Sequence, residues 1–344
     1  MTSIFSAISG HFTRLLVLGT LLPTVAFGLL AVLVLGPLVT TDPILLAQLL
    51  SMATDWHGLA WTAGIVFLTG ILYNANVPLI RLYEGYPWAK TFVGRRLSAR
   101  HRRRVEEAAR IYPRLACARA RLARSEATLR PLVQTRLNEL GHLLNERFPG
   151  SSLVLPTRLG NVIRSFEEYP RHQYSMSSIP LWPRLLATID KDYGTAIDDA
   201  KTSLDFMLNC SFLAALLSAA TVVAGLVGRR PFVTVEVTLA WMVVASCLAV
   251  FSYALYRGAV SRAIAWGGQV KGAFDLYRWE LLAKLGYQQK PRTRREERDL
   301  WKAICRQIVY GDPFEGTPPD YAPPPPEGLL KRLGHLALRQ PPRG

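Results

Sequence analysis

The stretch LLVLGTLLPTVAFGLLAVLVLGPLVTT, from Leu15 to Thr41, decides the fold class, because its 27 residues carry no charged side chain. Three further runs, Gly58–Ile80, Phe206–Gly228 and Val237–Tyr256, are also uncharged. As helices, these runs of 20 to 27 residues reach about 30 Å or more, the thickness of the hydrocarbon core of a bilayer. A helix also satisfies its own backbone hydrogen bonds in lipid. The sequence therefore predicts an all-α integral membrane protein with four transmembrane helices in two hairpins.

The uncharged runs and the segments between them define the expected organisation of the chain. We expect membrane spans over about 15–39, 58–80, 206–228 and 237–256. The expected segments are 1–80 (N-terminal segment and hairpin 1), 81–203 (cytoplasmic helical domain), 204–256 (hairpin 2), 257–310 (cytoplasmic helices packing on 81–203) and 311–344 (proline-rich spacer and basic amphipathic tail). Most of the charged residues thus belong to one predicted cytoplasmic part.

Lys and Arg residues fall almost entirely on one side of the predicted membrane. Thr41–His57, between the first two runs, contains none of them, and the loop between the last two runs contains only Arg229 and Arg230. The remaining 39 of the 41 Lys and Arg residues lie in the other segments. By the positive-inside rule, those segments face the cytoplasm. We therefore expect a multi-pass protein of the inner membrane with both termini in the cytoplasm.

Leucines at helical spacing mark the predicted cytoplasmic domain. The heptad-like seam consists of Leu115, Leu122, Leu129, Val133, Leu137, Leu140 and Leu144. Such spacing is typical of coiled-coil packing, and Pro113 and Pro131 predict that the helix is interrupted or restarted there. The seam must pack on another helix, either within the chain or across a homo-oligomer.

Sequence motifs of common enzymes and metal sites are absent. The six histidines form no H-E-x-x-H pattern, the four cysteines form no C-x-x-C pair, and there is no Walker A, G-x-S-x-G or G-x-G-x-x-G motif. We therefore assign no catalytic residue, no cofactor and no metal ligand. The sequence favours a non-enzymatic function.

A dense arginine cluster follows the second predicted span. It consists of Arg95, Arg96, Arg100, Arg102, Arg103 and Arg104, and Lys331 and Arg332 add a second basic group near the C-terminal end. Each such charge near the anionic inner leaflet contributes roughly 1 kcal/mol. We interpret both groups as contacts to anionic lipid headgroups. Nucleic-acid binding is the alternative, and it is disfavoured because no DNA- or RNA-reading motif accompanies the cluster.

The segment LPTRLGNVIRSFEEYPRHQYSMSSIPLWPRLL, residues 155–186, combines arginines, carboxylates and aromatic residues. One interpretation is a pocket for an anion or a partner, formed by Arg158, Asn161, Arg164 and Arg184, because guanidinium groups bind anions with two donors. The other is a structural corner in which these arginines pair with nearby carboxylates. The second interpretation is favoured, because ion-pair networks produce the same sequence pattern as sites do.

Several strings in the second half of the chain resemble those of a family of bacterial multi-pass inner-membrane proteins. They are PTRLGNVIRSFEEYPRHQY, LWPRLL, LDFMLN and GAFDLYRWELLAKLG, and RLYEGYPW follows the second run. The resemblance covers roughly residues 155–300. It implies a bacterial inner-membrane protein with a cytoplasmic helical domain, and it lends no activity and no catalytic residue.

Together these features predict a non-enzymatic, membrane-anchored sensor, scaffold or effector. It would couple a cytoplasmic binding event to the membrane or to a cytoplasmic protein partner. Two alternatives stay open: an oligomeric channel or membrane-permeabilising protein, and an enzyme that acts on lipid headgroups at the arginine-rich segment 155–186.

Overall fold

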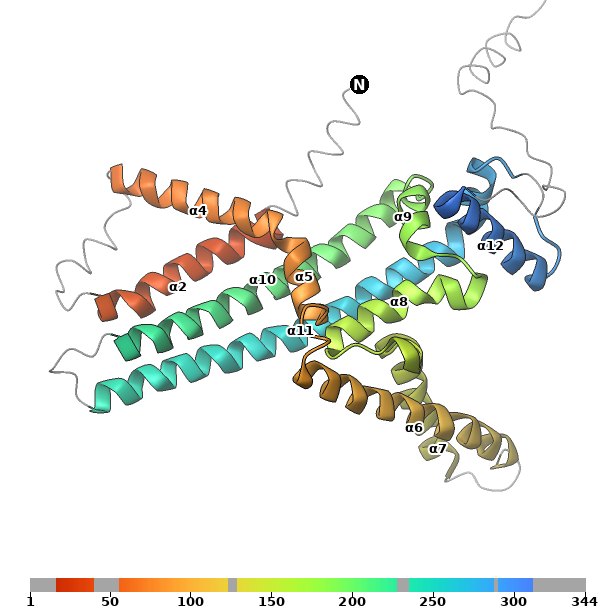
Figure 1. The fold of residues 1–344 in the computed structure, drawn as a ribbon, viewed down its shortest axis with the longest axis horizontal. Coiled ribbons are helices and arrows are strands. Elements are labelled where there is room, and N and C mark those ends of the chain that lie inside the picture. The colour runs from red at the N-terminus through yellow and green to blue at the C-terminus, as the bar shows by residue number, and fades with distance from the viewer. Residues whose placement is uncertain (1–16, 40–55, 123–128, 228–234, 288–289, 312–344) are drawn as a thin grey trace, which may run out of the picture. The chain divides into compact units, whose positions relative to one another are not determined.

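The computed structural model describes residues 17–39, 56–122, 129–227, 235–287 and 290–311. Within these segments the chain is all-helical and contains ten α-helices (Figure 1). The tail predicted beyond residue 311, including Lys331 and Arg332, lies outside the described residues.

Contacts divide the chain into two compact units. The first comprises Met1–Ser165 and Thr195–Gln269, and the second comprises Phe166–Gly194 and Val270–Gly344. Three helices contribute residues to both units: α8 (Arg158–Tyr174), α10 (Lys191–Val227) and α11 (Val235–Lys284).

Among the described residues, three helices are long and apolar enough to cross a membrane, over Val17–Gly36, Lys191–Leu226 and Leu239–Lys284. The first of these combines a π-helical turn, η1 (Val17–Leu21), with α2 (Leu22–Val39). A bent pair of helices brings the number of candidate spans to four. These findings indicate a multi-pass membrane protein.

The second predicted span, 58–80, is not one continuous helix. Helix α4 (Trp56–Asn74) ends before α5 (Asn76–Glu84) begins, and the two are bent by 54°. Pro78 explains the break, because it has no N–H to bond the carbonyl of Asn74 four residues earlier, and its ring clashes with that carbonyl. The expectation of an uninterrupted helix across this segment was therefore wrong.

Small polar residues join α10 and α11 within the first unit. The hydroxyl of Ser211 donates to the carbonyl of Ser252 at 3.0 Å, and the hydroxyl of Ser252 donates back to the carbonyl of Ser211 at 2.8 Å. Further along, Ser218 donates to the carbonyl of Ala245 at 2.7 Å. Small side chains of this kind allow close helix contact in membranes, and the two helices run side by side in Figure 1.

The π-helical turn η1, at the start of the first candidate span, is the part of that span that is hydrogen-bonded to α10. Asn209 on α10 is fully buried, and its side-chain amide donates to the carbonyl of Gly19 at 2.7 Å. One turn earlier on α10, the buried carboxylate of Asp205 pairs with Lys201 at 2.6 Å. Helix α2 also packs against α4.

Helices α6 (Phe92–Leu122) and α7 (Leu129–His142) pack against each other and contain the leucine seam except for Leu144, which lies in the π-helical turn η2 (Leu143–Arg147). Leu137 and Leu140 on α7 are buried. These two members of the seam are therefore covered within the chain, whereas Leu129 is 46% exposed. Pro113 lies inside α6 without interrupting it, contrary to the prediction, whereas Pro131 lies in the first turn of α7, where a missing N–H costs no hydrogen bond.

The second unit forms its own core. Helix α9 (Ser178–Leu186) packs on α12 (Arg294–Tyr310), and Trp301 and Phe274 are fully buried. The ring of Trp182 lies 6.0 Å from that of Phe274. Residues from before the third candidate span, from the last part of the fourth and from after it therefore contribute to one helical core.

Candidate functional site

Two of the quoted strings, RLYEGYPW and PTRLGN, meet in the first unit at a tightly packed junction. Thr157 donates its hydroxyl to the carbonyl of Glu84 at 2.8 Å and accepts the backbone N–H of Gly160 at 2.9 Å, so it caps the start of α8. A β-carbon on Gly85, which has a φ of +90°, would lie 2.6 Å from Pro156. The end of α5 is thereby fixed against the start of α8.

Asn161 holds the loop before α8 in place. Its side-chain oxygen accepts the N–H of Leu155 at 2.7 Å, and its amide donates to the carbonyls of Leu155 and Thr157 at 2.8 and 2.6 Å. The same amide lies 3.1 Å from Nδ1 of His101 on α6. The ring of His101 in turn packs edge-on against Phe148. Asn161 therefore ties α6 and the start of α8 together.

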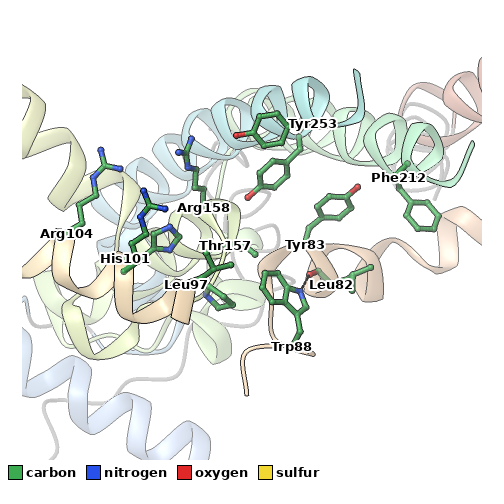
Figure 2. Close-up of a pocket in the computed structure, with 14 residues that line it drawn as sticks. Leu82, Tyr83, Trp88, Leu97, His101, Arg104, Thr157, Arg158, Phe212 and Tyr253 are labelled. Atoms are coloured by element: carbon green, nitrogen blue, oxygen red, sulfur yellow. Dashed lines mark hydrogen bonds between the residues drawn. The ribbon is translucent and has the colours of Figure 1, made fainter. Parts of the chain in front are cut away.

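A pocket of about 980 Å³ lies beside this junction, entirely within the first unit. Its cationic end is formed by Arg100, His101, Arg104 and Arg158, and the remaining lining comprises Leu82, Tyr83, Trp88, Leu97, Pro156, Thr157, Phe212, Ala215, Tyr253 and Tyr256. Figure 2 shows Arg104, Arg158 and His101 toward one end of the pocket and Tyr83, Leu82 and Phe212 toward the other. The pocket is thus amphipathic, and its volume lies at the upper end of the range typical of small-molecule sites, about 300–1,000 Å³.

Positive charge at the cationic end is not balanced by carboxylates. None of the described residues that line the pocket is Asp or Glu, and no described carboxylate forms an ion pair with Arg100, Arg104 or Arg158. Guanidinium groups remain protonated in proteins. The pocket therefore offers three permanent positive charges to a ligand.

His101 adds a titratable group to this end. Burial lowers the pKa of His101 below its ordinary value, and the charges of Arg158, Arg104 and Arg100 lower it further, while the carbonyl of Leu155 opposes the shift. His101 is therefore neutral at neutral pH and gains a proton only under acidic conditions.

Stacked tyrosines form the wall opposite the arginines. The rings of Tyr83 and Tyr256 stack with centroids 5.9 Å apart, and Tyr253 lies 6.3 Å from Tyr256. The hydroxyl of Tyr83 bonds to that of Ser211 at 3.0 Å, which anchors α5 to α10. The hydroxyl of Tyr256 accepts the N–H of Leu159 in the first turn of α8 at 3.4 Å. The wall thus consists of tyrosines from α5 and α11, which hydrogen bonds hold to α10 and α8.

The structure divides the residues predicted for the 155–186 site. Arg158 lines the pocket, while Asn161 is fully buried and acts on the adjacent loop. Arg164 is half-buried on α8 and does not line the pocket. Arg184 belongs to the second unit, where its guanidinium donates to the carbonyl of Pro180 at 2.6 Å.

The predicted arginine cluster is divided as well. All six arginines of this cluster are exposed, but only Arg100 and Arg104 line the pocket; the others are Arg95, Arg96, Arg102 and Arg103. Leu97, Arg100, His101 and Arg104 recur at positions i, i+3, i+4 and i+7, so they share one face of the helix. The spacing along α6 could therefore have revealed this face from the sequence. Nothing in the sequence around Phe212 or Tyr253 indicates that either residue lines the same pocket.

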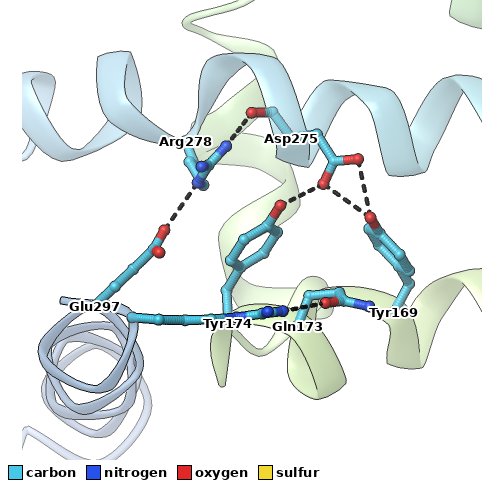
Figure 3. Close-up of polar contacts among 7 residues, drawn as sticks. Tyr169, Gln173, Tyr174, Asp275, Arg278 and Glu297 are labelled. Atoms are coloured by element: carbon cyan, nitrogen blue, oxygen red, sulfur yellow. Dashed lines mark hydrogen bonds and ion pairs between the residues drawn. The ribbon is translucent and has the colours of Figure 1, made fainter.

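The second unit contains a separate polar cluster (Figure 3). The carboxylate of Asp275 on α11 accepts the hydroxyl of Tyr174 at 2.6 Å and that of Tyr169 at 2.9 and 3.0 Å. Arg278 pairs with Glu297 at 2.8 Å and lies over the ring of Tyr174 at 4.7 Å. Burial and the hydrogen bond to Asp275 raise the pKa of Tyr169 to about 12. The cluster ties α8, α11 and α12 together: Arg278 pairs with Glu297, and the Asp275 carboxylate accepts two tyrosine hydroxyls.

Among the described residues, no three His, Cys, Asp or Glu side chains gather closely enough to hold a metal ion. No protein-family model, no curated protein and no solved structure matches the chain. Its function is therefore inferred from the chemistry of the amphipathic pocket.

Proposed function

We propose that this chain is a membrane-anchored sensor or effector of the bacterial inner membrane that recognises an anionic ligand in the amphipathic pocket. In this proposal all four candidate spans cross the membrane, and the termini and α6 face the cytoplasm. The distribution of Lys and Arg supports that orientation. The resemblance of the strings over roughly 155–300 to a family of inner-membrane proteins supports the location.

The observation that carries the proposal is the set of three uncompensated arginines in one pocket. Arg100 and Arg104 come from α6, and Arg158 comes from the start of α8. Guanidinium groups of this kind bind phosphate or carboxylate with directed pairs of hydrogen bonds. A group that neutralised them would also relieve their mutual repulsion, so binding an anion is favourable on both counts.

The position of the pocket explains how binding could be coupled to the rest of the protein. Its lining comes from α5, α6, α8, α10 and α11, and Phe212 and Tyr253 belong to helices of membrane-spanning length. A ligand held between Arg104 and Tyr253 would change the relative stability of arrangements of α6 and α11. Ligand binding is thus coupled to helices in the membrane, which is the behaviour required of a sensor or effector.

Anion binding can be tested with the full chain purified in a non-ionic detergent and pyrophosphate as the probe. We expect pyrophosphate to raise the melting temperature, and Arg158→Ala to remove that increase. Arg103→Ala is the matched control, because Arg103 is exposed on the same helix as Arg104 but does not line the pocket. A pyrophosphate effect that is equal in Arg158→Ala and in Arg103→Ala would refute the proposed pocket.

The orientation can be tested with a native cysteine. Cys117 is exposed on α6, Cys210 and Cys305 are buried, and the exposed Cys247 lies within the candidate span Leu239–Lys284. A membrane-impermeant maleimide should label Cys117 only after the cells are permeabilised, and Cys117→Ser should remove that labelling. Labelling of Cys117 in intact cells would place α6 outside and overturn the proposed orientation.

A further inference from the structure

We infer that the ligand of the amphipathic pocket is an anionic phospholipid, with its phosphate held by Arg100, Arg104 and Arg158 and an acyl chain lying along Phe212, Ala215 and Tyr253. This inference rests on the proposed function, because it names the ligand of the same pocket. It goes beyond that proposal by assigning the apolar half of the lining to a hydrocarbon chain.

The phosphate-binding end depends on guanidinium groups rather than on the backbone N–H groups at the start of α8. Gly160 N–H donates to the hydroxyl of Thr157, and Leu159 N–H donates to that of Tyr256. Because these backbone donors already have protein partners, the first turn of α8 has few N–H groups to offer an anion. The arginine side chains provide the charge and the donors, as in other phosphate sites that use arginine.

The other end of the pocket suits hydrocarbon. Phe212 and Ala215 lie on α10 within the candidate span Lys191–Leu226, and Tyr253 lies on α11 within the candidate span Leu239–Lys284. A free phosphate would occupy only the arginine end and would leave these apolar side chains in contact with water. A lipid fills both ends, so only a lipid buries the apolar lining as well as neutralising the arginines.

The surfaces around the apolar end are also suited to lipid. Leu216, next to Ala215 on α10, is 56% exposed, and Val250 and Phe251 on α11 are 69% and 50% exposed. In a helix of membrane-spanning length, exposed apolar side chains contact acyl chains. A lipid could therefore enter from the bilayer with its acyl chain remaining in an apolar environment. The arginines on α6 lie outside the candidate spans, where a headgroup is expected.

The test compares a lipid with its soluble counterpart on the full chain in non-ionic detergent. Short-chain phosphatidylglycerol, short-chain phosphatidylcholine and glycerol phosphate are titrated, and binding is read from the shift in melting temperature. We expect phosphatidylglycerol to bind at least about tenfold more tightly than glycerol phosphate, since burying two or more CH₂ groups accounts for that factor. Phosphatidylcholine should bind more weakly than phosphatidylglycerol, because its choline brings a positive charge near the arginines.

Two neighbouring positions on α10 provide a matched pair of variants. Ala215→Trp fills the apolar end, and Leu216→Trp adds the same ring to an exposed neighbour that does not line the pocket. We expect Ala215→Trp to weaken phosphatidylglycerol binding about tenfold while leaving glycerol phosphate binding unchanged, and Leu216→Trp to change neither. If Ala215→Trp does not fold, Tyr253→Ala removes part of the same wall and should also weaken only the lipid.

The outcomes separate the inference from the proposed function. If glycerol phosphate binds as tightly as phosphatidylglycerol, or if Ala215→Trp weakens both equally, the ligand is a soluble anion; the lipid inference then fails and the proposed function stands. If no anion binds in an Arg158-dependent manner, both fail. Equal binding of phosphatidylcholine and phosphatidylglycerol would overturn the selection for an anionic lipid.

Discussion

Gly160 lies directly against the backbone of Glu84, and a β-carbon at position 160 would stand 2.2 Å from the Glu84 carbonyl oxygen. The two residues are separated by a long stretch of chain that contains α6 and α7. Their contact brings the first turn of α8 against the end of α5, so that Arg158 and Tyr83 line the same pocket. Only a residue without a side chain allows this approach.

Gly160→Ala should therefore destabilise the protein. Backbone atoms must shift to admit the new methyl group, which costs about 1–3 kcal/mol. Gly268→Ala on α11 is the control, because it is also helical and has no atom within 4 Å of the added β-carbon. There the gain in helix propensity, up to about 1 kcal/mol, is unopposed. Thermal unfolding in detergent should lower the melting temperature only for Gly160→Ala, and equal effects would contradict the close contact.

His101 makes anion binding dependent on pH. Its pKa is lowered, chiefly by burial, so its ring is neutral at neutral pH. As the pH falls through that pKa, His101 gains a proton, and a fourth positive charge joins Arg100, Arg104 and Arg158. We expect the affinity for pyrophosphate to rise between pH 7 and pH 5. In His101→Gln the rise should be smaller, and an unchanged pH profile would contradict the role of His101.

The same group affects the stability of the unliganded protein in the opposite direction. The pKa of His101 is lower in the folded state than in the unfolded state, so the unfolded chain binds more protons as the pH falls below about 6.5. The contribution of His101 to stability is thus present above that pH and is lost on acidification. The melting temperature should fall more steeply from pH 7 to pH 5 in the parent than in His101→Gln. A parallel decline would show that His101 does not contribute.

The membrane helices could be predicted from sequence because a span is a property of one continuous segment. Leu15 to Thr41 is apolar over a sufficient length, and no partner needs to be known. The bend between Asn74 and Asn76 could also have been read from Pro78, whose ring and missing N–H act on the residue four positions earlier.

The pocket could not be predicted in the same way, because it depends on contacts between distant segments. The arginine face of α6 can be derived from the spacing of Arg100 and Arg104. Its opposite wall, with Phe212 and Tyr253, lies more than 100 residues further along the chain and has no charge or motif to distinguish it. Asn161 illustrates the two interpretations left open by the sequence: its buried amide holds the loop before α8, as the favoured structural interpretation of 155–186 expected.

In the second unit, the hydroxyls that Tyr169 and Tyr174 direct at Asp275 should contribute to stability. A hydrogen bond to a charged acceptor contributes about 1.5–3 kcal/mol when buried, and both tyrosines are only half-buried. We expect Tyr174→Phe to cost about 1 kcal/mol, and the double variant with Tyr169→Phe to cost more because Asp275 then loses both donors. Tyr310→Phe is the control, since Tyr310 is 75% exposed. Unfolding in detergent measures all three, and a Tyr174→Phe variant as stable as Tyr310→Phe would contradict this role.

Lys201 and Asp205, one turn apart on α10, form an ion pair. We expect the loss of Lys201 alone to destabilise the protein more than the loss of both residues. Their charged atoms lie 2.6 Å apart, and Asp205 is 1% exposed. Lys201→Met leaves a buried carboxylate without its cation, which should cost about 3 kcal/mol. Replacing both residues, as Lys201→Met with Asp205→Leu, removes the buried charge and should recover most of that loss. Thermal unfolding of the single and double variants forms a mutant cycle. If the double variant is no more stable than Lys201→Met, then Asp205 stabilises the protein through contacts other than the one with Lys201. The ion pair would then not explain why Asp205 is buried.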